Sequence, residues 1–331
     1  MTKNKQKRVL SGIRATGTLH LGNYLGAVKG MLELQDDPDY ETLYMVADVH
    51  TLTTPYDVKE LQENRREVFL DYLAAGLDPE KSVIFFQADV PEHTELAFYF
   101  SSVMSIARMQ HLPTFKEKVK QYPENATMAL LNYPILMAAD ILAYKAGFVP
   151  VGIDQEPHLE VAREIARKMN AQYGLDFPEP QRFATTGEYV PSLTGEGKMS
   201  KSVEGSYINL TDDLETIRQR LASAPTDSGQ GDKVPTSGGV ANLLQLVNLF
   251  QGEKQKTEYE KAYLGEGIKY QDLKEDLAQA IYKEFQPIQE KRAELVADPA
   301  QVDQVIADGA QRARDIARAT VDEVKEKMGL A

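Results

Sequence analysis

Apolar runs alternate with amphipathic segments through the first half of the chain. Four short runs predict buried strands, at 9–13, 42–47, 83–88 and 148–152. Periodic apolar positions predict the intervening helices, at 21–34, 58–75, 95–109, 132–144 and 156–169, with a polar loop at 110–118. Strands that alternate with helices in this way indicate an α/β fold with a doubly wound parallel sheet.

Polar residues follow two of the predicted strands. Asp48 and His50 come directly after the run 42–47, and Gln87 lies at the end of the run 83–88. Ligands of such sheets bind outside the carboxyl ends of the strands, so these three residues are candidate site residues. A turn or capping role explains Asp48 and His50 equally well, and it is the better explanation for Gln87.

The pattern becomes almost entirely helical after residue 212. A polar, Gly-rich connection at 224–239 interrupts the helical segments, and an Ala-rich helical region closes the chain at 299–327. We therefore predict an α/β domain over residues 1–205, followed by an α-helical domain over residues 206–331.

Composition restricts the class of protein. The 331 residues include no cysteine, which excludes disulfides and thiolate metal sites, and no metal-ligand set is predicted. No apolar run approaches the roughly 20 residues of a membrane helix, so we expect a cytoplasmic protein with no membrane or DNA partner. The net charge of −13 argues against a whole-surface nucleic-acid binder, although local basic patches can still bind RNA.

Two short motifs suit a polyphosphate ligand. The segment 17–23, Gly-Thr-Leu-His-Leu-Gly-Asn, is a loop-to-helix turn that follows the first predicted strand. A helix N-terminus of this kind offers unpaired N–H groups and a positive dipole end. The segment 198–202, Lys-Met-Ser-Lys-Ser, places two lysines in a Gly/Ser-rich loop, where they supply compact positive charge.

Asp140 lies in the middle of an apolar helical segment. A carboxylate on such a face is costly unless it is paired or used, so Asp140 is a candidate site residue. A satisfied structural aspartate and a solvent-facing turn are the alternatives.

These motifs together resemble the bacterial-type tryptophanyl-tRNA synthetases, which are class I aminoacyl-tRNA synthetases. The resemblance rests on elements in family order and at family-like spacing, at 11–13, 16–27, 133–142, 149–152, 154–155 and 198–202. It implies a Rossmann-like catalytic domain, a helical domain that binds the tRNA anticodon, and a homodimer. It also implies tryptophan–tRNA ligase activity, with tryptophanyl-adenylate formed from L-tryptophan and ATP and then used to charge tRNA(Trp).

The resemblance implies an ATP site with Mg²⁺ as cofactor. The turn would contribute Thr18, His20, Gly22 and Asn23, and the lysine loop would contribute Lys198, Met199, Ser200 and Lys201. Gly152 and Asp154 would hold the ribose, and Lys116 would reach the phosphates. Of these residues, Lys198, Lys201, Lys116, His20 and Asn23 would take part in catalysis.

The resemblance also implies the tryptophan pocket. Asp140 would accept the indole N–H, which is only a donor. Met137, Val149 and Val151 would form apolar walls near His50, and Tyr133 and Gln155 would hold the amino group. A tyrosine hydroxyl can also donate to a carboxylate, so chemistry alone leaves a tyrosyl-type synthetase open.

Several positions depart from the family pattern. Arg14 replaces the usual glutamine, Leu10 an aromatic residue and Val49 another glutamine, and Val-Glu-Gly at 203–205 replaces Asp-Pro. These departures are compatible with an auxiliary paralogue of shifted substrate tolerance.

Two further alternatives are a nucleotidylyltransferase and a synthetase-like protein that binds or regulates a partner. The first class lacks this helical second half, and the second does not need the motif residues that this chain keeps. Arg312, Arg314 and Arg318 are hypothesised to contact tRNA, although an ordinary solvated helix face explains them equally well.

Overall fold

The centre of the protein is a parallel five-stranded sheet with strand order β3-β2-β1-β4-β5. The computed structural model describes residues 6–183 and 189–331. The strands are β1 (Lys7–Arg14), β2 (Tyr40–Ala47), β3 (Val83–Phe86), β4 (Phe148–Pro150) and β5 (Gln181–Phe183). The predicted doubly wound parallel sheet is thereby confirmed, with four strands at the predicted places. The fifth, β5, spans only three residues and carries no long apolar run, so the sequence pattern missed it.

Helices cover both faces of the sheet. On one face lie α1 (Leu21–Asn23), the π-helical turn η1 (Tyr24–Val28), α2 (Lys29–Asp36) and α3 (Val58–Ala74), which pack on Tyr44 and Val46. On the other face, α4 (Glu92–Ser101), α7 (Met128–Ala143) and α8 (Glu156–Tyr173) pack on Leu43 and Met45. The alternation along β2 follows from the two-residue period of a strand, and it divides the apolar core into two clusters.

Short 3-10 helices follow the strands at the carboxyl edge of the sheet. They are η2 (Val49–Thr53) after β2, η3 (Gln87–Asp89) after β3 and η5 (Ile153–Gln155) after β4, and a fourth, η4 (Pro123–Asn125), precedes α7.

Three details of the predicted helices are wrong. The predicted helix 95–109 is two helices, α4 and α5 (Ile106–Gln110), because the Ser105 side chain caps a new helix start. The predicted polar loop at 110–118 contains α6 (Pro113–Gln121), which begins at its proline, where the missing N–H costs nothing. Helix α7 begins at Met128, four residues before the predicted start, so Pro134 lies inside it.

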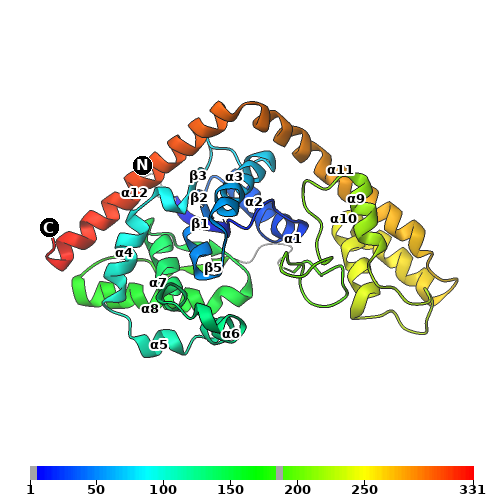
Figure 1. The fold of residues 1–331 in the computed structure, drawn as a ribbon, viewed down its shortest axis with the longest axis horizontal. Coiled ribbons are helices and arrows are strands. Elements are labelled where there is room, and N and C mark those ends of the chain that lie inside the picture. Colours follow the sequence, from blue (N-terminus) through cyan, green and yellow to red (C-terminus); the bar gives the residue numbers. More distant parts are fainter. Residues whose placement is uncertain (1–5, 184–188) are drawn as a thin grey trace.

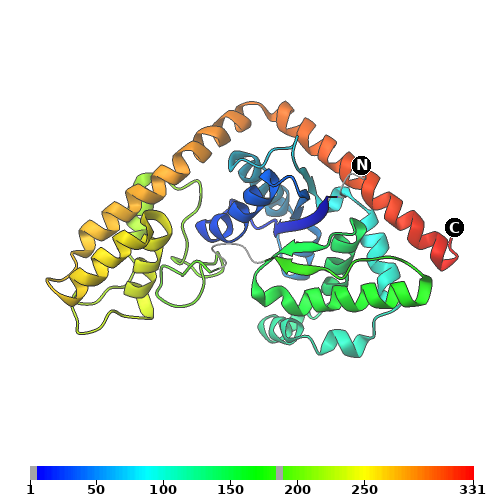
Figure 2. The same cartoon turned by 180° about the vertical axis from the view of Figure 1, so that it is seen from behind.

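Four helices complete the chain: α9 (Leu214–Ala222), α10 (Gly238–Leu264), α11 (Tyr270–Ala297) and α12 (Pro299–Met328). Helix α11 packs on α9 and α10 and then runs towards α3 (Figure 1). Helix α12 continues from α11 at an angle and lies along the sheet domain, and its C-terminal end is remote from the α9–α10 bundle, as Figure 2 shows from behind. Region 206–331, predicted as one helical domain, is therefore divided: α9, α10 and the first part of α11 form a bundle, and α12 packs on the sheet.

The contact between α12 and the sheet is close. A Cβ atom added at Gly309 would lie 1.8 Å from the carbonyl oxygen of Ile84 on the edge strand β3. Ala313 and Ala317 continue this small-residue face and are fully buried. Covering an edge strand in this way removes its exposed backbone groups from competing partners.

The three arginines of α12 also bind within the chain. Arg312 donates to the carbonyl of Pro79 at 2.6 Å, Arg314 to that of Asp89 at 2.5 Å and Arg318 to Glu92 at 2.8 Å. These bonds fasten α12 to the sheet domain and argue against the hypothesis that these guanidinium groups serve tRNA. Within the described parts of the chain, no helix is long and apolar enough to cross a membrane.

Candidate active site

A cavity of about 460 Å³ opens at the carboxyl edge of the sheet, beside β1, β2 and β4. All seven predicted substrate-binding residues line it, and they come from four separate segments: His50, Tyr133, Met137, Asp140, Val149, Val151 and Gln155. Asp154 lines it as well. The strand order places these segments together, because β1 and β4 are neighbours where the sheet changes direction.

Asp140 is the buried polar centre of the cavity wall, with no exposed surface. His50 Nε2 lies 2.8 Å from Oδ2, and on the other oxygen Gln87 Nε2 donates to Oδ1 at 2.8 Å. His93 Nδ1 lies 2.7 Å from Oδ1, and its Nε2 lies 2.6 Å from the Tyr144 hydroxyl. Burial alone would raise the pKa of Asp140, but the two histidines outweigh it and lower this pKa to about 2. The carboxylate is therefore ionised at neutral pH and only accepts hydrogen bonds.

Gln87 and Asp48 hold the strand ends in place. Gln87 Oε1 accepts from the backbone N–H of Val49 at 3.1 Å and of His50 at 3.3 Å, so it fixes the turn that carries the histidine. Asp48 accepts from the backbone N–H of Ala88 at 2.9 Å. The cavity lining includes neither of them. Gln87 and Asp48 therefore hold the loops beside the cavity without lining it, and Gln87 also donates to Asp140.

His158 connects a second group of polar residues of the cavity. Its Nε2 lies 2.7 Å from the Tyr133 hydroxyl and 2.9 Å from that of Thr114, and its Nδ1 lies 3.0 Å from Gln155 Oε1. Because an amide oxygen only accepts, Nδ1 carries the proton, and Nε2 accepts with its single lone pair, which the hydroxyls of Tyr133 and Thr114 share. Burial lowers the pKa of His158 to about 4, so the ring is neutral at pH 7. Tyr133 thus directs its proton to His158 and keeps oxygen lone pairs available.

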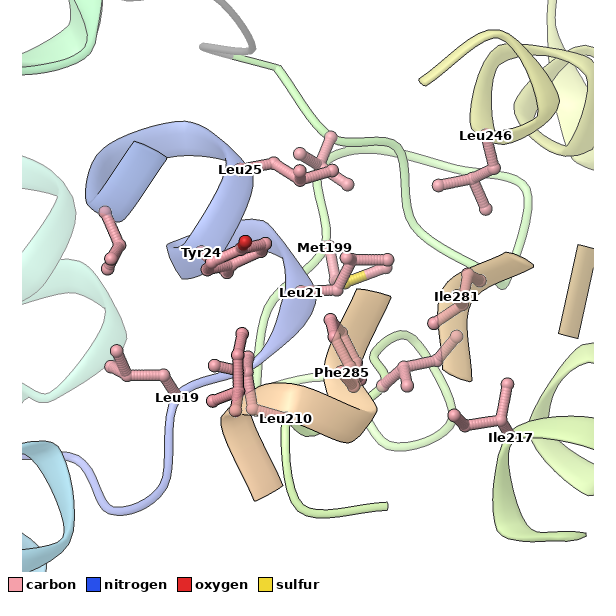
Figure 3. Packing of buried hydrophobic residues seen from close by; sticks show 14 of the residues in the cluster. Leu19, Leu21, Tyr24, Leu25, Met199, Leu210, Ile217, Leu246, Ile281 and Phe285 are labelled. Atoms are coloured by element: carbon pink, nitrogen blue, oxygen red, sulfur yellow. The ribbon is translucent and has the colours of Figure 1, made fainter. Parts of the chain in front are cut away.

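The turn at 17–23 packs on the lysine loop and on the segment that follows it. A Cβ at Gly22 would lie 3.4 Å from Met199 Cβ. In the following segment, the backbone N–H of Leu21 donates to the carbonyl of Ile208 at 2.8 Å, and that of Leu210 donates to the carbonyl of Leu19 at 2.9 Å. Figure 3 shows the Met199 side chain beside Leu21. Met199 is only 2 % exposed, so the middle of the lysine loop is anchored in the core.

His20 begins the helix of this turn. Its Nδ1 accepts from the backbone N–H of Asn23 at 3.3 Å, and Asn23 Oδ1 accepts from the backbone N–H of His20 at 3.2 Å. Burial lowers the pKa of His20 to about 4, with a further contribution from the positive charges of Lys201 and Lys198. A Cβ at Gly22 would lie 2.8 Å from the His20 ring, so a larger residue would disturb this cap.

Lys201 closes the loop over the turn. Its ammonium donates to the backbone carbonyl of Thr16 at 3.0 Å. Burial lowers the pKa of Lys201, while the charges of Asp71 and Glu67 act in the opposite direction. Lys198 is exposed. The two predicted motifs are therefore neighbours in space, with two cations beside one helix start.

The motif cluster and the cavity are distinct places. The described lining of the cavity includes no residue of the turn at 17–23 or of the lysine loop. Lys116 lies exposed on α6 and is also outside the lining, whereas Glu117 and Lys118 on the same helix belong to it. Asp154 is exposed and close to Gly152, where a Cβ would lie 2.6 Å from its carboxylate.

Sequence reasoning missed His93, His158 and Thr114. His93 and His158 are almost fully buried, and both follow predicted site segments. A buried histidine in an amphipathic helix was the available signal, but its meaning depends on partners that are distant in sequence. No cluster of three potential metal-ligating side chains occurs within residues 6–183 and 189–331.

The chain matches the family of class I tRNA synthetases for W and Y, tryptophan and tyrosine, over residues 2–286. It is 42 % identical to a tryptophan–tRNA ligase of Porphyromonas gingivalis, over 97 % of this chain and 98 % of that protein. It is 38 % identical to the corresponding ligase of Clostridium acetobutylicum, over 99 % and 98 %.

Among solved structures, the chain resembles tryptophanyl-tRNA synthetase from Campylobacter jejuni, complexed with ADP and tryptophan. The TM-score is 0.85 at 32 % identity, covering 98 % of this chain and 100 % of that chain. The chain therefore belongs to the class I tRNA synthetases of tryptophan and tyrosine, and within them to the tryptophan–tRNA ligases.

Proposed function

We propose that the chain activates L-tryptophan with ATP in this cavity and transfers the tryptophanyl group to tRNA(Trp). The observation that carries the proposal is the ionised, fully buried carboxylate of Asp140 between apolar walls. An indole ring needs apolar surface together with one acceptor for its N–H. Asp140 supplies that acceptor beside the wall residues Met137, Val149 and Val151.

The indole N–H binds Asp140 at Oδ2, beside His50. A carboxylate has about four lone-pair positions, and three donors already lie next to the two oxygens of Asp140. The substrate ammonium then binds Tyr133 and Gln155, whose acceptor atoms His158 orients. Both ends of the amino acid are thus recognised by acceptors.

ATP binds between the cavity and the motif cluster. Thr18, His20, Gly22 and Asn23 approach the nucleotide at the helix start, and Gly152 and Asp154 hold its ribose. Lys198 and Lys201 bind the β- and γ-phosphates, with Met199 and Ser200 fixing the loop, and Lys116 reaches in from α6. Mg²⁺ enters as part of the Mg·ATP substrate, because the phosphate oxygens provide the hard ligands that it prefers.

Activation is an in-line displacement. A carboxylate oxygen of tryptophan forms a bond to the α-phosphorus, the bond from that phosphorus to the bridging oxygen breaks, and pyrophosphate leaves with that electron pair. In the second step a ribose hydroxyl of the tRNA attacks the carbonyl carbon, and AMP leaves. No enzyme side chain forms a covalent bond, so positioning and electrostatic stabilisation provide the catalysis.

The remaining parts of the proposal concern partners. Helices α9, α10 and the first part of α11 form the bundle remote from the sheet, and we assign anticodon binding to this part of region 206–331. We also propose that two copies of the chain associate and that the protein works in the cytoplasm.

The test is ATP–pyrophosphate exchange with tryptophan or tyrosine as the amino acid. Exchange with tryptophan alone is expected, and Lys201→Ala should lower its rate by about 10²- to 10³-fold while tryptophan binding stays unchanged. Lys254→Ala, at an exposed position of α10, is the matched control and should leave the rate unchanged. Exchange with tyrosine, or no exchange at all, would contradict the proposal.

A further inference from the structure

Arg14 places a positive charge on the wall of the cavity. It is the last residue of β1, so its side chain stands at the carboxyl edge of the sheet beside β2 and β4. It lines the cavity together with His50 and Tyr133. Its Nη2 donates to the Thr54 hydroxyl at 3.0 Å, which fixes the position of the guanidinium.

This guanidinium lacks a counter-ion within the described chain. No acidic side chain of residues 6–183 or 189–331 forms an ion pair with it, whereas Arg8 on the same strand pairs with Glu41 at 2.7 Å. Its Nε is buried and has no hydrogen-bond partner. Burying a charge without a partner is costly. An arginine stays protonated at neutral pH nevertheless, so the cavity holds an uncompensated cation.

The position of Arg14 relative to the other polar groups identifies the missing anion. Asp140 and His50 line the cavity, and Tyr133 and Gln155 provide acceptors for an ammonium group. An α-amino acid held at its side chain and its ammonium has one polar group left, its carboxylate. The other ammonium or guanidinium group in the lining is Lys118, which is held at the end of its own helix by Gln121 at 3.0 Å and by the Tyr122 ring at 5.7 Å.

We propose that Arg14 binds the α-carboxylate of the amino-acid substrate, an inference that rests on the proposed function. A guanidinium can donate two parallel hydrogen bonds to a carboxylate, which fixes orientation as well as position. Arg14 thus holds the nucleophile, and the substrate supplies the counter-ion that the chain lacks. Recognition of the amino acid then involves three separate contacts: the indole N–H, the ammonium and the carboxylate.

The test compares two ligands in wild-type and variant protein. L-tryptophan and tryptamine share the indole and the ammonium, but tryptamine lacks the carboxylate. The chain contains no tryptophan, so indole fluorescence reports on the ligand alone. Wild type should bind tryptophan more tightly than tryptamine, and Arg14→Met should reduce this preference by about 10- to 100-fold, the contribution of a charge-assisted hydrogen bond. Arg14→Lys should retain part of the preference, since it keeps the charge.

Each other outcome has a distinct meaning. Equal weakening of both ligands by Arg14→Met would assign Arg14 to packing, and a preference that survives while ATP binding weakens would assign it to a phosphate; either result overturns the proposal. Arg167→Met removes a surface guanidinium paired with Glu160 and Glu179, and it should change neither affinity. If wild type binds neither ligand, the proposed function itself fails, whatever Arg14 does.

Discussion

His158 makes the stability of the protein depend on pH in an accessible range. Burial lowers the pKa of its ring from 6.5 to about 4 in the folded chain. The unfolded chain therefore binds more protons between these two pH values, so the free energy of unfolding decreases as the pH falls from 6.5 to 4. Each pH unit in this window corresponds to about 1.4 kcal/mol, so His158 should contribute roughly 3 kcal/mol to the loss.

Replacing the ring isolates this contribution. His158→Asn removes the titrating group and leaves a side chain that can donate and accept hydrogen bonds. His20, with a pKa also lowered to about 4, adds a loss of the same sign over this range, whereas Asp71, whose pKa burial raises to about 6, acts in the opposite direction. Because His20 and Asp71 are present in both proteins, the variant should lose about 3 kcal/mol less than wild type. The physical reason is that burial away from water disfavours the charged ring, and a protonated Nε2 also has no lone pair left for the hydroxyls of Tyr133 and Thr114.

The measurement is urea unfolding at a series of pH values from 7 down to about 4, a range set by the two pKa values. Tryptophan affinity measured at the same pH values shows whether the amino-acid site weakens in parallel. His111→Asn is the matched control, because this histidine is exposed and should leave the slope of stability against pH as in wild type. Equal slopes for wild type and His158→Asn would refute the reasoning.

Two further predictions concern the indole contact and helix α12. Asp140→Asn replaces one of the two acceptor oxygens with an NH₂ group, which then faces other donors. The tryptophan KM should rise about 10- to 100-fold, and the fold should lose about 1–3 kcal/mol of stability. Unchanged tryptophan affinity in exchange assays would remove Asp140 from indole recognition. Gly309→Ala forces a methyl group against the Ile84 carbonyl, so thermal unfolding should show a loss of about 1–3 kcal/mol. A Cβ at Gly147 meets nothing within 4 Å, so Gly147→Ala should be nearly neutral; equal effects of these two glycine substitutions would contradict the docking of α12.

Sequence patterns predicted most of the sheet because each of its longer strands is an apolar run. They failed at helix starts and at a short strand, where the surrounding structure and not the local pattern decides the conformation. Pro113 begins a helix in a segment that reads as a polar loop, and Ser105 restarts a helix within a continuous periodic pattern. The short strand β5 exists through pairing with β4 alone, and pairing leaves little trace in three residues.

The site divides in the same way. Motif residues such as Asp140, Tyr133 and Gln155 were named as site candidates through the family resemblance, and the fold gathers them in one cavity. The roles of His158 and His93 were not predictable, since a buried histidine takes its tautomer from partners up to about fifty residues away, as with the Tyr144 hydroxyl.

The sequence by itself determined the parallel sheet, the two motifs and their chemistry, because apolar periodicity and local spacing are properties of neighbouring residues. Only the tertiary structure decided that α12 lies on the sheet and that Arg312, Arg314 and Arg318 bind within the chain. It also decided that Arg14 is a half-buried cation, with a buried Nε and no counter-ion in the described chain. Burial, pairing and charge compensation depend on segments far apart in sequence, and folding alone brings those segments together.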